Sequence, residues 1–206
     1  MKEWLRMNAD KLSLEDFLLP DDHPLVQLEL GRLRATPEAP MVDSGAKTLW
    51  VHDHREFYEN KGIPWLEPTK HKGGKGLCPY NPQAEANNPW YASRTDREKH
   101  FIHGYDVLAP LHGGPDGGKE EILELGKNIT WSSRVTGRSH AVTPGGQLWL
   151  RRRARLVLGA EKMQLQGMYV GTYCGSKISS SRLADLAGNA VSNHCWSVIA
   201  TAFFAS

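Results

Sequence analysis

Residues 155–167 read RLVLGAEKMQLQG, and residues 186–191 read LAGNAV. In the first stretch Arg155 stands six residues before Glu161 and a glycine ends the run, which is typical of an amphipathic helix with a glycine stop. In the second stretch a Gly-Asn pair precedes an apolar segment whose residues recur at helical spacing. We therefore expect the chain to close with a helix that Gly188 opens.

Together the two stretches resemble motifs IX and X of the DNA cytosine-5 methyltransferases, the two blocks that close the chain in that family. The positions that match motif IX are Arg155, Glu161, Leu165, Gln166 and Gly167, whereas Ala160, Met168 and Tyr169 depart from its pattern. Residues 138–146, RSHAVTPGG, look like the Thr- and Gly-rich approach to this motif in the family.

The resemblance implies a site for S-adenosylmethionine and a surface for DNA. Gly188, Asn189 and Ala190 would reach the methionine end of the cofactor. Glycine allows close backbone approach, asparagine offers a donor and an acceptor, and a helix N-terminus presents free amides to a carboxylate. The residues that would face DNA are Thr143, Arg151, Arg152, Arg153 and Arg155. The arginines would contact phosphates.

The catalytic motifs of the family are not recognisable in this sequence. There is no Phe-x-Gly-x-Gly, and the only Cys-Pro neighbours, Cys78 and Pro79, stand in the reverse order of the family's Pro-Cys nucleophile. Covalent attack on cytosine needs an activated thiolate beside a proton donor, after the base is flipped from the duplex. We expect a truncated, split or degenerate methyltransferase that is inactive alone and depends on a complementing half or a second copy.

A different class of protein fits the same residues. The chain could be a non-catalytic DNA-binding or scaffold module that retains a vestigial cofactor loop. For either function the expected fold is α/β or α+β, the C-terminal part of a methyltransferase-like fold with an irregular target-recognition-like region. The expected segments are a helical one over residues 1–42, the recognition-like region over 43–150 and the motif IX/X segment over 151–206.

Local patterns predict the individual elements. Ser13-Leu-Glu-Asp16 has the form of a helix start, and residues 13–34 read as two short helices. From residue 43 to about 118 the abundance of Gly, Pro and polar residues predicts irregular structure with short strands. The further expected elements are strands over 47–51, 101–108, 128–138 and 147–150, a turn at Pro144-Gly145-Gly146, and helices over 119–125 and 159–165.

Composition indicates a folded protein without a marked overall charge. The 206 residues are 40% hydrophobic and include seven Trp, and the formal charge is +2. Attraction to nucleic acid must therefore come from local clusters, such as residues 70–75 and 151–155. Three cysteines without C-x-x-C spacing suit reduced thiols, and we find neither a secretory signal nor a membrane span. We expect an intracellular protein, nuclear if eukaryotic.

Two other patterns suggest rival chemistry. Gly113-Gly-Pro-Asp-Gly-Gly118-Lys119 satisfies most of a phosphate-loop pattern, but Glu120 replaces the hydroxyl that would bind magnesium, which favours a solvent loop. His52 and His54, or His100 and His103, could hold a metal if they lie on one face of a strand. Because no matched set of cysteines or carboxylates accompanies them, we expect ordinary surface histidines and no metal.

Overall fold

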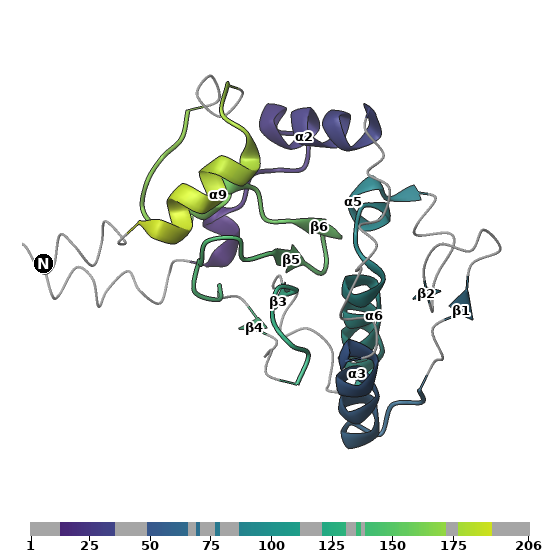
Figure 1. Ribbon diagram of the computed structural model, residues 1–206. Coiled ribbons are helices and arrows are strands. Elements are labelled where there is room, and N and C mark those ends of the chain that lie inside the picture. The colour runs from purple at the N-terminus through teal and green to yellow at the C-terminus, as the bar shows by residue number, and fades with distance from the viewer. Residues whose placement is uncertain are drawn as a thin grey trace, which may run out of the picture.

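The computed structural model describes residues 13–35, 49–65, 69–70, 77–78, 87–111, 121–130, 135–136, 139–171 and 177–190. Helices surround a small sheet (Figure 1). In that view α2 and α9 lie above the sheet, and α3 and α6 lie together to its right.

The helices of the described residues include the two expected near the N-terminus and the one expected over residues 159–165. The short 3-10 helix η1 begins after Ser13, whose backbone N–H donates to Asp16 Oδ2 at 2.7 Å, as the sequence predicts. The helix expected over residues 159–165 is confirmed with the same bounds. The helices are η1 (Leu14–Phe17), α2 (Pro24–Ala35), α3 (Leu49–Asn60), α5 (Pro89–Ala92), α6 (Asp96–Leu111), α7 (Gly159–Leu165) and α9 (Ser180–Asn189).

The central sheet is antiparallel throughout. Its strands are β3 (Glu121–Glu124), β4 (Val135–Thr136), β5 (Leu148–Leu150) and β6 (Arg155–Leu156), in the order β4-β3-β5-β6. A separate hairpin pairs β1 (Thr69–Lys70) with β2 (Leu77–Cys78). Antiparallel strands with helices packed around them define an α+β fold. Of the two expected classes, α+β is thus confirmed, and the arrangement fits part of a methyltransferase-like fold.

Two segments expected as strands are helices. Thr95 and Glu98 form a capping box at the start of α6, because each accepts a hydrogen bond from the other's backbone N–H, at 3.3 and 3.0 Å. This signal explains why residues 101–108 are not a strand. In α3, the buried Trp50, His54 and Phe57 recur every three or four residues, the helical period. The expectation of irregular structure from residue 43 to 118 is wrong where these two helices lie.

The segment expected as a helix over residues 119–125 contains strand β3 instead. All four of its side chains are buried, and the strand pairs with β4 on one side and β5 on the other. Burial and pairing in the middle of a sheet outweigh the helix propensity of Glu and Leu. The expected strand over 128–138 is reduced to β4 in the part that the structure describes, whereas the strand and turn over 144–150 are confirmed.

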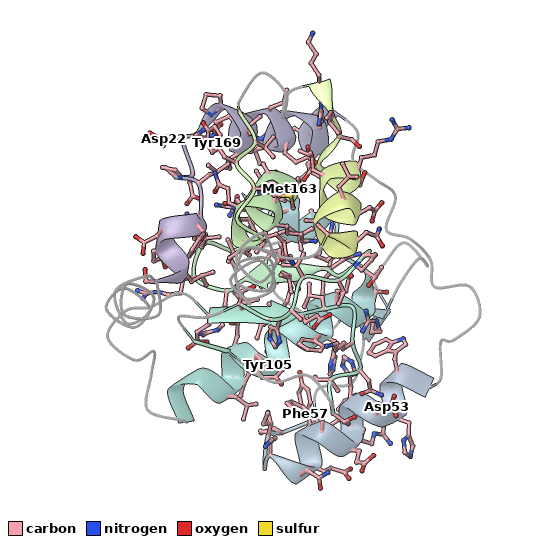
Figure 2. All side chains as sticks on the ribbon, turned by 90° about the vertical axis from the view of Figure 1, so that its left-hand side faces the viewer. Asp22, Asp53, Phe57, Tyr105, Met163 and Tyr169 are labelled. Atoms are coloured by element: carbon pink, nitrogen blue, oxygen red, sulfur yellow. The ribbon has the colours of Figure 1, made fainter. Side chains whose placement is uncertain are left out.

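One apolar core joins the expected segments. It contains Val26, Leu123 and Leu158, which come from the three segments in turn. On α3 and α6, Phe57 and Tyr105 lie close together (Figure 2), with ring centroids 5.5 Å apart. The three-part division remains a prediction. Of the described helices, none has the length and apolar character to cross a membrane.

Candidate functional site

The residues that match motif IX form a buried ion pair between β6 and α7. Arg155 Nη1 and Nη2 each lie 2.9 Å from one carboxylate oxygen of Glu161, a bidentate arrangement. The two residues are 2% and 0% exposed. Glu161 Oε2 also accepts the backbone N–H of Leu158 at 2.7 Å and thereby caps the first turn of α7. The motif IX spacing therefore builds the start of this helix.

The same pair fastens the N-terminal segment to the sheet. The N–H of Leu19 donates to Glu161 Oε1 at 2.8 Å, and its carbonyl accepts from Arg155 Nη2 at 2.9 Å. Arg155 Nε donates to Asp21 Oδ1 at 2.9 Å. Burial by itself would lower the pKa of Arg155, but the bonds and charges of Glu161 and Asp21 outweigh it and raise the pKa, so the group stays charged. The position of Arg155 does not support its expected contact with DNA.

Helices α7 and α9 cross in close contact at a glycine. A Cβ atom built on Gly159 would lie 2.1 Å from the carbonyl oxygen of Ser180 and 2.6 Å from Leu183 Cβ. The N–H of Gly159 donates to Ser180 Oγ at 2.8 Å. In Figure 2, α9 lies beside α7, which carries the labelled Met163. Helices α7 and α9 therefore pack as one unit.

The turn over residues 143–146, the Thr143 turn, brings the two predicted ligand-facing regions together. It closes with the N–H of Gly146 donating to the carbonyl of Thr143 at 3.1 Å. Pro144 at its second position and the φ of +67° at Gly145 are typical of a type II turn. A Cβ on Gly188 would lie 2.1 Å from Pro144 N and 2.4 Å from the Thr143 carbonyl carbon. Only glycine permits this backbone approach.

Two polar side chains that sequence reasoning missed hold the Thr143 turn. Lys162 Nζ of α7 donates to the carbonyl of Gly146, and Asp185 Oδ1 of α9 accepts the N–H of Gly145 at 3.3 Å. Burial lowers the pKa of Lys162, although the charges of Asp185 and Glu124 act in the opposite direction. No local pattern predicts these contacts, since 16 and 40 residues separate the partners along the chain.

The predicted cofactor residues lie at the end of α9. Gly188 is in the last turn of this helix, so the expectation that it opens a helix is wrong. Asn189 is exposed, and its Nδ2 donates to the carbonyl of Asp185 at 2.9 Å. Ala190 ends the helix in an extended conformation, with φ −82° and ψ 142°. The apolar segment expected to form the closing helix lies outside the described residues.

The remaining predicted DNA residues form the basic turn, residues 151–154, which joins β5 to β6. Arg152 is exposed, and the side chains of Arg151 and Arg153 are 18% and 21% exposed. Ala154 has a φ of +48°, an unfavourable value for a residue with a Cβ, and Asn88 Nδ2 donates to its carbonyl at 2.7 Å. The basic turn and the Thr143 turn lie at opposite ends of β5.

The histidines considered for a metal lie on helices, so the expected sharing of a strand face is wrong. His54 of α3 and His100 of α6 are buried, and their Nδ1 atoms are 2.9 Å apart. Such a contact requires one nitrogen to donate and the other to accept, so at least one imidazole is neutral. Among the residues described, no group of three or more His, Cys, Asp or Glu side chains is arranged to hold a metal ion.

The buried histidine pair should make the protein acid-sensitive. Burial, followed by the charges of His100 and Arg97, lowers the pKa of His54 to about 2, whereas an unfolded histidine titrates near 6.5. Below pH 6.5 the unfolded state binds a proton that the folded state excludes, so stability is complete above that pH and falls on acidification. The expected loss is about 2 kcal/mol between pH 6.5 and 5.0.

Urea unfolding of the wild type and of His54→Gln at both pH values measures this loss. The His54→Gln variant should lose clearly less stability on acidification. His52→Asn is the control, because His52 is 81% exposed on the same helix and its removal should leave the pH dependence unchanged. Equal pH dependence of wild type and His54→Gln would contradict the prediction.

Several sequence expectations cannot be placed. Residues 71–76 and 113–119 lie outside the described part of the chain, and Cys78 is described only as backbone in β2. Trp90 and Tyr91 are 7% and 6% exposed and belong to the core. They therefore support the sheet from within rather than offering a face to a ligand.

Comparison with known proteins relates the chain to one class of enzyme. It is similar to the DNA (cytosine-5-)-methyltransferase DMT5 of Cryptococcus neoformans var. grubii, with 26% identity over 183 residues, or 86% of this chain. It is also similar to the protein of the same name from Verticillium dahliae, with 25% identity over 145 residues, or 69% of this chain. The matches span 8% and 6% of the lengths of these relatives. No protein-family model matches. The similarity supports a distant relationship to DNA cytosine-5 methyltransferases.

Proposed function

We propose that the chain is the recognition-side and cofactor-loop part of a DNA cytosine-5 methyltransferase and that it contributes to methyl transfer only with a complementing half. The observation that carries this proposal is the contact of Gly188 with the Thr143 turn. Residues assigned by resemblance to the cofactor side and to the DNA side are 45 positions apart in sequence and yet share a backbone contact. A methyltransferase needs such proximity, because the methyl donor and the target base must meet.

The residues at the end of α9 fit part of a site for S-adenosylmethionine. The exposed amide of Asn189 carries a donor and an acceptor, which suits the amino-acid end of the cofactor. Gly188 and Ala190 would hold the backbone beside it. When bound, S-adenosylmethionine supplies the methyl group. The Thr143 turn and the arginines of the basic turn would orient DNA, and the attacking thiolate would come from the complementing half.

Complementation tests this function. The purified chain should transfer no radiolabelled methyl group to unmethylated DNA, because it lacks a recognisable nucleophile. Mixing or co-expressing it with a protein that bears the Phe-x-Gly-x-Gly and Pro-Cys motifs should restore transfer. The partner alone is the matched control. Transfer by the isolated chain that is lost in Cys78→Ala would overturn the requirement for a second half.

One observation favours the alternative of a non-catalytic DNA-binding or scaffold module. Asn189 donates to its own helix and Gly188 packs on the Thr143 turn, so both residues have structural roles that need no cofactor. A vestigial loop predicts salt-sensitive binding to duplex DNA without any restored transfer on complementation. The same mixing experiment, with a DNA titration beside it, separates the two functions.

A further inference from the structure

Each arginine of the basic turn whose contacts are defined is held by an acidic side chain of the same chain. Arg153 Nη2 lies 2.5 Å from Glu15 Oε2 of η1, and its Nη1 donates to the carbonyl of Leu19 at 2.7 Å. Arg151 Nε donates to Asp106 Oδ1 of α6 at 2.7 Å, and its Nη1 lies 3.2 Å from Glu121 Oε2. Carboxylates from η1, α6 and β3 therefore surround a turn expected to bind phosphate.

These carboxylates fall into two kinds by exposure. Glu121 is fully buried, so its contact with Arg151 belongs to the interior of the sheet. The side chains of Glu15 and Asp106 are 43% and 49% exposed and lie at the surface. Because these two carboxylates are open to solvent, water and other anions can exchange with them, although the arginines themselves are only 18% and 21% exposed. A fully exposed ion pair contributes only about 0.2–1 kcal/mol. Phosphate oxygens form charge-assisted, bidentate hydrogen bonds with arginine and suit the same donors.

We propose that Glu15 and Asp106, the acidic pair, compete with DNA phosphates for Arg153 and Arg151. In the free protein the acidic pair neutralises Arg151 and Arg153 and weakens the attraction of the basic turn for nucleic acid in general. A duplex that also contacts other parts of the protein displaces the acidic pair and takes over the two arginines. This inference rests on the proposed DNA contact and adds a self-competition that limits non-specific binding.

A DNA titration with charge-neutral variants tests the competition. Fluorescence anisotropy would measure the affinity of the full chain for a short labelled duplex over a range of salt concentrations. Glu15→Gln and Asp106→Asn should each tighten binding about two- to fivefold, the loss of one exposed pair. Each should also steepen the dependence of log affinity on log salt by up to about 0.9. The double variant should bind the duplex more tightly than either single variant.

Glu29→Gln is the matched control. Glu29 forms an exposed ion pair with Arg32 at 3.1 Å on α2, so its neutralisation changes the net charge equally without involving the basic turn. It should shift affinity less than Glu15→Gln does. Adding Arg153→Gln to Glu15→Gln should remove the gain. Thermal unfolding of every variant shows whether the fold is intact, and Glu15→Gln decides the question if Asp106→Asn destabilises the protein.

The two ways of failing are distinct. If the wild type binds duplex DNA and Glu15→Gln binds no more tightly than Glu29→Gln, the competition is refuted and the DNA contact stands. If neither the wild type nor any variant shows salt-sensitive binding, the proposed DNA contact fails and the competition fails with it.

Discussion

Replacing Glu161 by glutamine should lower the free energy of unfolding by about 3–5 kcal/mol, because Arg155 would keep its charge inside the protein without the carboxylate that balances it. Both side chains are almost fully buried, and the carboxylate accepts from three groups: the Arg155 guanidinium and the backbone N–H groups of Leu19 and Leu158. Glutamine offers one acceptor oxygen where glutamate offers two. Urea unfolding followed by tryptophan fluorescence measures the loss.

The exposed pair of Glu29 and Arg32 is the control for this prediction. Glu29→Gln removes a carboxylate from a similar distance, 3.1 Å, but at the surface, and should cost less than about 1 kcal/mol. The double variant Arg155→Met with Glu161→Leu should recover part of the loss, because apolar groups can replace a buried ion pair. A Glu161→Gln variant as stable as Glu29→Gln would show that the pair does not hold the fold together.

Replacing Gly188 by alanine should destabilise the protein by about 3 kcal/mol, at the upper end of the usual cost of overpacking. The new Cβ would lie 2.1 Å from Pro144 N and 2.6 Å from Pro144 Cα, and both are backbone atoms that cannot rotate away. The end of α9 must therefore move off the Thr143 turn. The gain in helix propensity, about 0.5–1 kcal/mol, is too small to offset this displacement.

Gly31→Ala is the control, and its expected effect on stability is the opposite of that of Gly188→Ala. Gly31 is an exposed residue within α2, and nothing lies within 4 Å of the Cβ that alanine would add. The substitution should raise stability by about 0.5–1 kcal/mol. Thermal unfolding of both variants checks the pair of predictions. If Gly188→Ala were as stable as Gly31→Ala, the close contact between α9 and the Thr143 turn would be refuted.

Local signals predict the parts of this fold that depend on local contacts. The Ser13–Asp16 helix start, the Pro144–Gly145 turn and helix α7 are each determined by residues within a few positions of one another, and all three are confirmed. The capping box of Thr95 and Glu98 is also a local signal. The expectation of a strand over residues 101–108 does not take this signal into account. Helix α6 was therefore predictable.

Non-local contacts account for what the sequence could not show. Strand β3 is stabilised by its position between β4 and β5, in which Ile122 pairs with Val135 and Leu150, 13 and 28 residues further along the chain. The burial of Arg155 depends on Leu19 and Asp21, about 135 residues earlier, so a basic cluster looks like a DNA surface until the fold places its members. The resemblance to motifs IX and X remains a prediction, and the bonding partners of each side chain in those stretches follow only from packing.

The attachment of Leu19 and Asp21 to Arg155 and Glu161 limits where the protein can be trimmed in the laboratory. A fragment that starts at Pro24 would keep α7, α9 and the sheet. It would lose the backbone groups of Leu19 and the carboxylate of Asp21, which form hydrogen bonds with the buried pair of Arg155 and Glu161. Such a fragment should aggregate or remain partly unfolded. Expression of the region around α7 and α9 for binding or crystallographic work therefore needs an N-terminal boundary ahead of Ser13.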